Sequence, residues 1–339
     1  IIVFVAGYAA IAFEHPLQLN KAASALITGV LCWTIYMLQS DTTHTVTEEL
    51  LHHLGEIASI LFFLLGAMTI VELIDSHNGF DIITQKIKTT NKATLLVIIV
   101  TLTFFLSALL DNLTTAIVMT SLCTKILAEK EDKLWFAGMT VIAANAGGAW
   151  SPLGDVTTTM LWIGGQITAL NIMKQLILPS LAACIIPAAI VAYKFRGKKV
   201  AAIPPSTCTA QEQREGRIIL FAGVGFLIFV PIFKTVTHLP PFMGMLLALG
   251  CMWVITTIIH KGKDLDHAEP LSVARALQKV DTPSILFFLG ILLAVSALQS
   301  VGLLGELATF LSSTFKNDYL IGTALGLLSA LVDNVPLVA

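Results

Sequence analysis

The stretch Ser107-Ala-Leu-Leu-Asp111-Asn112 returns almost letter for letter as Ser329-Ala-Leu-Val-Asp333-Asn334, and both copies lie in long apolar sequence. A charged side chain at the centre of a bilayer costs about 3 kcal/mol or more, so an acidic residue in such a place indicates a functional site. Two such sites in corresponding halves of a chain are typical of a transporter with a binding cavity near the membrane midplane. The repeated motif therefore predicts a membrane transporter.

The composition supports a membrane protein. Hydrophobic residues make up 56% of the 339 residues and charged residues only 12%, whereas soluble domains carry roughly 25% charged residues. The mean hydropathy is +0.84. A net charge of -2 gives no support for a nucleic-acid partner. The five cysteines show no CxxC or metal-like spacing and are interpreted as core thiols. We expect an all-α polytopic membrane protein embedded in a lipid bilayer, without a cofactor.

Seven apolar segments are predicted to cross the membrane, because a spanning helix needs about 20 apolar residues. These segments are residues 1–13, 21–38, 54–74, 175–193, 218–233, 241–259 and 283–300. The apolar run 93–127 is too long for one span and too short for two at about 1.5 Å per residue. It therefore predicts a re-entrant hairpin with Asp111-Asn112 at its tip, which is tolerated where protein or water surrounds it.

Residues 134–166 form the second irregular region. Gly, Pro, Asn and Asp interrupt the hydrophobic sequence between Asn145 and Asp155. This composition predicts a helix that is broken within the membrane, where unpaired backbone groups can coordinate an ion.

The loops follow the rule that Lys and Arg collect on the cytoplasmic side. The strongest basic cluster opens the segment 194–217, so we expect this linker to be cytoplasmic and the protein to lie in the inner (plasma) membrane of a bacterium. Counting spans in both directions places every other basic loop on the same side. The two halves then enter the membrane in opposite orientations.

An internal repeat accompanies this change of orientation. Residues 13–35 align with 233–255, and Ser59-Ile-Leu-Phe-Phe-Leu matches Ser284-Ile-Leu-Phe-Phe-Leu. We therefore predict an inverted-topology repeat. The first copy is 1–193, the linker is 194–217, and the second copy, 218–339, is expected to be incomplete at its C-terminus. The segment beyond it is expected to hold the return limb of the second hairpin and another broken helix.

Three stretches together resemble the NhaD-type sodium/proton antiporters of the ion transporter (IT) superfamily: Phe62 to His77, Ser107 to Thr115, and Asn145 to Asp155. The resemblance implies the IT superfamily fold, with a re-entrant hairpin and a broken helix in each repeat. It also implies a homodimeric carrier that exports Na⁺ or Li⁺ in exchange for protons by alternating access. In the second copy, Val335-Pro336 stands where the first has Leu113-Thr114, so a threonine ligand is not expected there.

Na⁺ prefers oxygen ligands, which leads to a specific set of candidate residues. Asp111 is expected to be the main exchange carboxylate, with the proton and Na⁺ competing for its oxygens. The neighbours at its subsite are Asn112, Ser107, Thr114, Asn145 and Asp155, and Asp333 and Asn334 form the pseudo-symmetric partner. The Na⁺ ion itself is expected at Asp111, Asn112, Asn145, Asp333 and Asn334. Glu72, Asp75 and His77 form either a proton path or a solvated helix end.

Several alternatives stay open at this point. Asp111 and Asp155 could be helix N-caps rather than ligands, and the asparagines could serve only to satisfy unwound backbone. An arsenite or anion permease, or a Na⁺-coupled carboxylate symporter, would share the superfamily. Pro152-Leu-Gly154-Asp155 partly matches the motif of intramembrane aspartyl proteases, although its first glycine is replaced. His44, His52 and His53 could bind a metal in the outer loop, but their spacing matches no strong motif.

Overall fold

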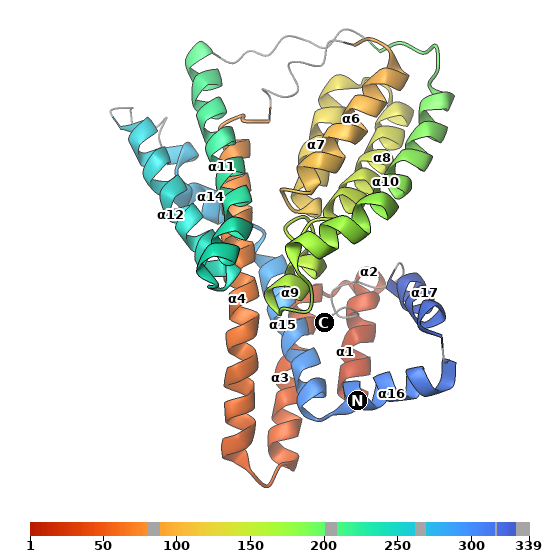
Figure 1. Cartoon of the computed structure of the whole chain (residues 1–339), viewed down its shortest axis with the longest axis vertical. Helices are drawn as coiled ribbons and strands as arrows, with labels where there is room; N and C mark the ends of the chain where they lie inside the picture. The colour runs from red at the N-terminus through yellow and green to blue at the C-terminus, as the bar shows by residue number, and fades with distance from the viewer. Residues whose placement is uncertain (81–88, 201–208, 262–268, 316, 330–339) are drawn as a thin grey trace. The chain divides into compact units, whose positions relative to one another are not determined.

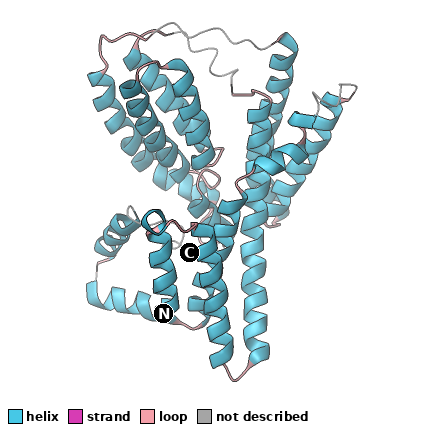
Figure 2. Cartoon of the chain, turned by 180° about the vertical axis from the view of Figure 1, so that it is seen from behind, coloured by secondary structure: helices cyan, strands magenta, loops and turns pink. Residues whose placement is uncertain are grey.

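The computed structural model describes residues 1–80, 89–200, 209–261, 269–315 and 317–329 (Figure 1). Within these residues all regular elements are helices, and the β-type pairing is limited to one isolated bridge between Asn91 and Lys199 (Figure 2). Six helices are long and apolar enough to cross a membrane: α3 (Lys21–Gln39), α4 (Thr43–Ser76), α10 (Ala169–Lys194), α11 (Ala210–Thr237), α12 (Pro241–His260) and α15 (Thr282–Ser300). The chain is a polytopic all-α membrane protein.

These six helices correspond to six of the seven predicted spans, but several extend further than the apolar sequence does. Helix α4 begins at Thr43 rather than near residue 54, because a helix continues through polar residues that hydropathy does not count. Helix α11 begins at Ala210, within the segment predicted as a linker. Its start is fixed by a capping box, in which Thr209 and Glu212 satisfy each other's backbone N–H groups. Helix α1 (Ile2–Ala12) covers the remaining predicted span with only 11 residues.

The chain forms two compact units, one made of Ile1–Phe62 with Asp281–Ala339 and the other of Phe63–Val280. The first unit contains α1, α2 (Glu14–Leu17), α3, the start of α4, α15, α16 (Leu303–Phe315) and α17 (Asp318–Ser329).

In the first unit, α3 packs closely along α15. A Cβ atom placed on Gly29 would lie 2.6 Å from the carbonyl oxygen of Gly290, so the two backbones nearly touch. Small residues permit this kind of close crossing in membranes. The Trp33 indole on α3 donates a hydrogen bond to the Leu293 carbonyl on α15 at 2.9 Å. The pair is therefore held by both packing and a polar contact.

The second unit contains one core built on the end of α4. This core includes Phe63 and Ile70 of α4, Leu227 of α11 and Met245 of α12. Trp162 of α9 (Val156–Ile163) also belongs to it and meets Phe63 edge to face, with ring centroids 6.3 Å apart. The short elements η1 (Glu269–Leu271) and α14 (Val273–Lys279) complete this part.

The same unit holds a bundle in which α6 (Lys92–Ser107), α7 (Asn112–Ile126) and α10 surround α8 (Lys130–Ala149) (Figure 1). Phe104 and Phe136 lie fully inside its core. At one end, the buried ammonium of Lys92 pairs with the buried carboxylate of Asp132. Leaving one member of a buried ion pair unpaired is strongly destabilising, so this pair fixes the start of α6 against α8. The bundle is the scaffold on which the candidate site is built.

Candidate functional site

Asp111 lies where the chain turns between α6 and α7. It is the N-cap of α7, and its Oδ1 atom accepts a hydrogen bond from the Thr114 N–H at 2.8 Å. Its Oδ2 atom accepts one from the Thr114 hydroxyl at 2.5 Å. The capping role considered from the sequence is therefore present. These two hydrogen bonds leave acceptor positions of the carboxylate unused, because a carboxylate has about four lone-pair positions.

Asp155 repeats this arrangement on a second helix. The chain leaves helical conformation after Ala149 and re-enters it at Val156, with Asp155 as the N-cap of α9. Its Oδ1 atom accepts hydrogen bonds from the Thr157 N–H at 2.9 Å and from the Thr157 hydroxyl at 2.5 Å. The hydroxyls of Thr158 and Thr159 hold the intervening turn through the carbonyls of Ser151 and Pro152. The helix is thus interrupted between Ala149 and Val156.

Asn112, the first residue of α7, forms hydrogen bonds to the cap residue of α9 and to α8. Its Nδ2 group donates to Asp155 Oδ2 at 2.6 Å and to Asn145 Oδ1 at 3.0 Å. Within the described parts of the chain, the Asn112 Oδ1 atom accepts no hydrogen bond. Asp155 is buried while Asn145 is exposed, so the cluster is accessible from one side. The first residue of α7 thus contacts the capping carboxylate of α9.

Three glycines allow the elements to come this close. A Cβ atom on Gly147 would lie 2.2 Å from the Phe104 carbonyl oxygen, and one on Gly154 would lie 2.3 Å from the Ser107 carbonyl oxygen. A Cβ atom on Gly148 would lie 2.2 Å from the Gly154 carbonyl oxygen. These distances are far below contact, so side chains at these positions would push α6, α8 and the turn apart.

Of the remaining predicted residues, Ser107 lies beside the cluster and two others are not described by the structure. Ser107 is fully buried, and its hydroxyl donates to the Ala144 carbonyl at 2.6 Å, so it ties α6 to α8 beside the cluster. Asp333 and Asn334 lie outside the described residues. Hydrogen bonds link Asn112 to Asn145 and Asp155, and Asp111 to Thr114.

Glu72, Asp75 and His77 lie at the end of α4 and form a different group. Glu72 pairs with Lys279 of α14 at 2.9 Å and accepts a hydrogen bond from Ser76. The His77 ring is buried and stacks on His260 of α12, with the two Nε2 atoms 3.2 Å apart. Among the described residues, no hydrogen bond connects this group to Asp111 or Asp155.

Sequence reasoning missed Thr115 of α7 and Lys234 of α11. Thr115 is buried, and within the described residues its hydroxyl has no hydrogen-bond partner; the signal was its place next to Thr114, three positions after the repeated motif. Lys234 of α11 donates to the Trp162 carbonyl at 2.7 Å and lies 4.6 Å above the Trp162 ring. A cation is favoured at a helix C-terminus, so Lys234 holds the far end of α9. Nothing in the local sequence around Lys234 or Trp162 indicates that these two residues are in contact.

A family model described as "Citrate transporter" (CitMHS) matches residues 8–339. The chain therefore belongs to this family of membrane transporters. The family is not one of enzymes, which makes the protease alternative wrong.

Three relatives carry such names. The chain is 45% identical to Sodium/proton antiporter 1 of Arabidopsis thaliana over all of its own length and 58% of the relative. It is 42% identical to Sodium/proton antiporter 2 of the same plant, covering 80% of that relative. It is 31% identical to the Na⁺/H⁺ antiporter NhaD of Vibrio cholerae over 99% of this chain and 75% of the relative. The chain thus spans about three-fifths of the first relative, and its resemblance to the NhaD type is confirmed.

Proposed function

We propose that this chain forms the core of a secondary active transporter that exchanges Na⁺ or Li⁺ for H⁺ by alternating access. The observation that carries the proposal is the link between the starts of two helices: Asn112, which directly follows the capping Asp111, donates a hydrogen bond to the capping carboxylate of Asp155 at 2.6 Å. The antiporter names of the relatives support the same activity.

The chemistry of exchange follows from mutual exclusion. A carboxylate withdrawn from bulk water is stabilised when its charge is neutralised by a proton or by a bound cation. Both use the same oxygen lone pairs, so binding of Na⁺ expels the proton and protonation expels Na⁺. The N–H groups of the helix starts hold the empty carboxylates in place between the two events. Oxygen ligands for Na⁺ are then available from Asp111, Asp155, Asn112 and Asn145.

The architecture that we propose for this cycle is an inverted repeat. The matched segments 13–35 and 233–255 fall in α3 and α12, and the matched Ser59 and Ser284 stretches fall in α4 and α15. Helix α3 packs on α15, and α12 packs on α4. Matched elements therefore make matched pairs, which supports the repeat.

We also propose that α6 and α7 form a re-entrant hairpin. They have 16 and 15 residues, which gives lengths of about 24 Å and about 22 Å. Both are shorter than the hydrocarbon core of about 30 Å. A helix pair that stops short of the far side brings Asp111 to rest inside the membrane.

Orientation and assembly are proposed from the sequence. The linker 194–217 faces the cytoplasm according to its basic residues, and the protein acts as a homodimer, as the NhaD resemblance implies. Relatives with antiporter names come from a plant and from bacteria. We therefore widen the predicted bacterial inner membrane to a membrane that carries a proton gradient.

The family description names citrate, which makes a carboxylate carrier the second candidate. A tricarboxylate would be attracted to helix N-termini. Here the N-termini of α7 and α9 are already occupied by the carboxylates of Asp111 and Asp155. Like charges would repel such a substrate, so the site favours a cation.

The proposal is tested by flux in vesicles that contain the purified full chain and carry an acid-inside pH gradient. We expect NaCl and LiCl to dissipate the gradient, and choline chloride and choline citrate to leave it unchanged. A fluorescent pH indicator measures the change. Citrate uptake without any response to Na⁺ would make the carboxylate carrier the correct function.

Thr115 offers a sharper test of the site's composition. Replacing Thr115 by Val removes a buried hydroxyl that has no partner among the described residues and keeps nearly the same shape. If the hydroxyl serves only the fold, its loss is neutral or stabilising, since an unpaired buried group costs about 1–3 kcal/mol. We expect instead that the KM for Na⁺ rises about tenfold while the melting temperature does not fall. An unchanged KM would remove Thr115 from the site.

A further inference from the structure

An apolar groove runs between α8 and α10. It has a volume of about 410 Å³ and is lined by Leu134, Trp135, Gly138, Met139, Ile142, Pro187 and Val191. The groove exists because Gly138 and Pro187 carry no long side chain. A surface of this kind in a membrane protein accepts hydrocarbon.

One end of the groove is rimmed by a cation and an indole. The Lys194 ammonium lies 3.7 Å from the centre of the Trp135 ring, and Trp135 itself lines the groove. Tryptophan is favoured at the level of lipid headgroups. Lys194 also lies 3.4 Å from Glu131, but both groups are well exposed, and such a pair is weak. Lys194 is therefore available to a stronger anion.

The charge around this end is positive. The short segments 129–133 and 194–199 meet here through Lys194 and Glu131. They carry six basic residues, Lys130, Lys133, Lys194, Arg196, Lys198 and Lys199, against three acidic ones, Glu129, Glu131 and Asp132. Asp132 is already paired with the buried Lys92. The Lys198 backbone is held by a hydrogen bond from the Lys92 N–H at 3.0 Å, so the cluster has a fixed position.

We propose that this groove binds an anionic phospholipid, with an acyl chain between α8 and α10 and the phosphate at Lys194. Apolar contact and positive charge meet at one place, Trp135, which suits a molecule with the same two parts. A zwitterionic lipid would fill the groove but would gain little from the cations. The inference does not depend on which ion the protein transports.

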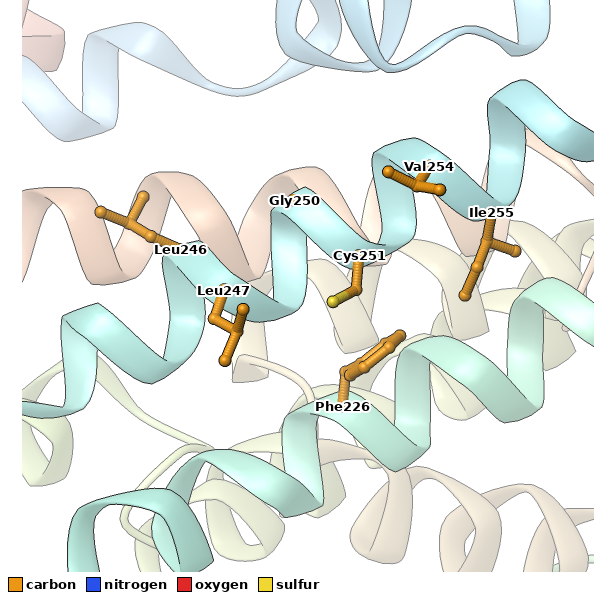
Figure 3. Close-up of a pocket in the computed structure, with 7 residues that line it drawn as sticks. All are labelled: Phe226, Leu246, Leu247, Gly250, Cys251, Val254 and Ile255. Carbon is orange, nitrogen blue, oxygen red and sulfur yellow. The ribbon is translucent and has the colours of Figure 1, made fainter. Parts of the chain in front are cut away.

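A second groove in the same chain provides an internal control. It lies between α11 and α12, has a volume of about 570 Å³ and is lined only by apolar side chains (Figure 3). No Lys or Arg lies within four positions of any lining residue on either helix. This larger groove should accept acyl chains without regard to the headgroup.

The test compares retention of phosphatidylglycerol and of phosphatidylcholine with the same acyl chains by the purified full chain, measured by native mass spectrometry. We expect wild type to retain phosphatidylglycerol at least about fivefold more. Gly138→Leu fills the groove, and a Cβ atom there meets nothing within 4 Å, so the fold tolerates it. Gly138→Leu and Lys194→Gln should each remove the preference.

Gly250→Leu is the matched control, because Gly250 lines the apolar groove and a Cβ atom there also meets nothing within 4 Å. It should leave the preference for phosphatidylglycerol unchanged. The proposal is overturned if Lys194→Gln retains the full preference, or if Gly250→Leu loses as much as Gly138→Leu does. Lys194 is an exposed position, so its variant keeps the test valid even if a leucine at 138 impairs folding.

Discussion

Asp111→Asn is expected to abolish sodium-driven proton exchange, with a loss of about 100-fold or more, and to leave the fold intact. Asparagine is as good an N-cap as aspartate, so the Thr114 N–H keeps an acceptor in place of Oδ1, where the bond is now 2.8 Å. The variant loses only the negative charge. In the proposed site this charge pairs with bound Na⁺; removing one member of such a charge pair costs about 2–5 kcal/mol, and each 1.4 kcal/mol is about tenfold in affinity.

The measurement is the rate at which NaCl dissipates an imposed pH gradient in vesicles, together with the melting temperature in detergent. Asp281 supplies a matched control. It caps α15 in the same way, accepting from the Ser284 N–H and from the Ser284 hydroxyl at 2.5 Å, but it is exposed. Asp281→Asn should change neither quantity. If Asp111→Asn still exchanged Na⁺ for H⁺ at a normal rate, Asp111 would be a cap and nothing more.

The helix starts at Asp111 and Asp155 also show what local sequence can predict. The turn at Asp111 and the break before Asp155 follow from composition, since Asp before Thr starts a helix and Gly with Pro ends one. The meeting of Asn112 with Asp155, 43 residues apart, came from the family resemblance. Composition alone would have placed each aspartate in its own loop.

Contacts between distant helices were beyond prediction for a physical reason. Lys234 and Trp162 are 72 positions apart, and His77 and His260 are 183 apart. Apolar helices show little preference for one partner, because hydropathy marks them as buried in lipid or protein without saying which. Which faces meet depends on small residues such as Gly29 and Gly290, whose close approach is visible only in three dimensions. The helix ends also escaped prediction, as α4 and α11 continue into polar sequence.

Gly148→Ala is the second change from which we expect a large effect, although it adds a single methyl group. That methyl would lie 2.2 Å from the Gly154 carbonyl oxygen and 3.4 Å from the Asn112 Cβ atom. The first neighbour is backbone and cannot rotate away, so the turn that carries Asp155 must move. Overpacking of this kind costs about 1–3 kcal/mol. The movement would also lengthen the 2.6 Å hydrogen bond between Asn112 and Asp155.

We therefore expect Gly148→Ala to lower the melting temperature and to reduce sodium-driven exchange by about tenfold to 100-fold, as a displacement of about 1 Å at a reacting site does. Gly138→Ala, on the same helix, is the control, since its Cβ atom would meet nothing within 4 Å. Alanine is favoured over glycine in a helix by about 1 kcal/mol, so this variant should be at least as stable as wild type and equally active. If both variants behaved alike, the close approach of α8 to the turn at Gly154 would have no part in forming the site, and the two carboxylates would have to be held together by Asn112 alone.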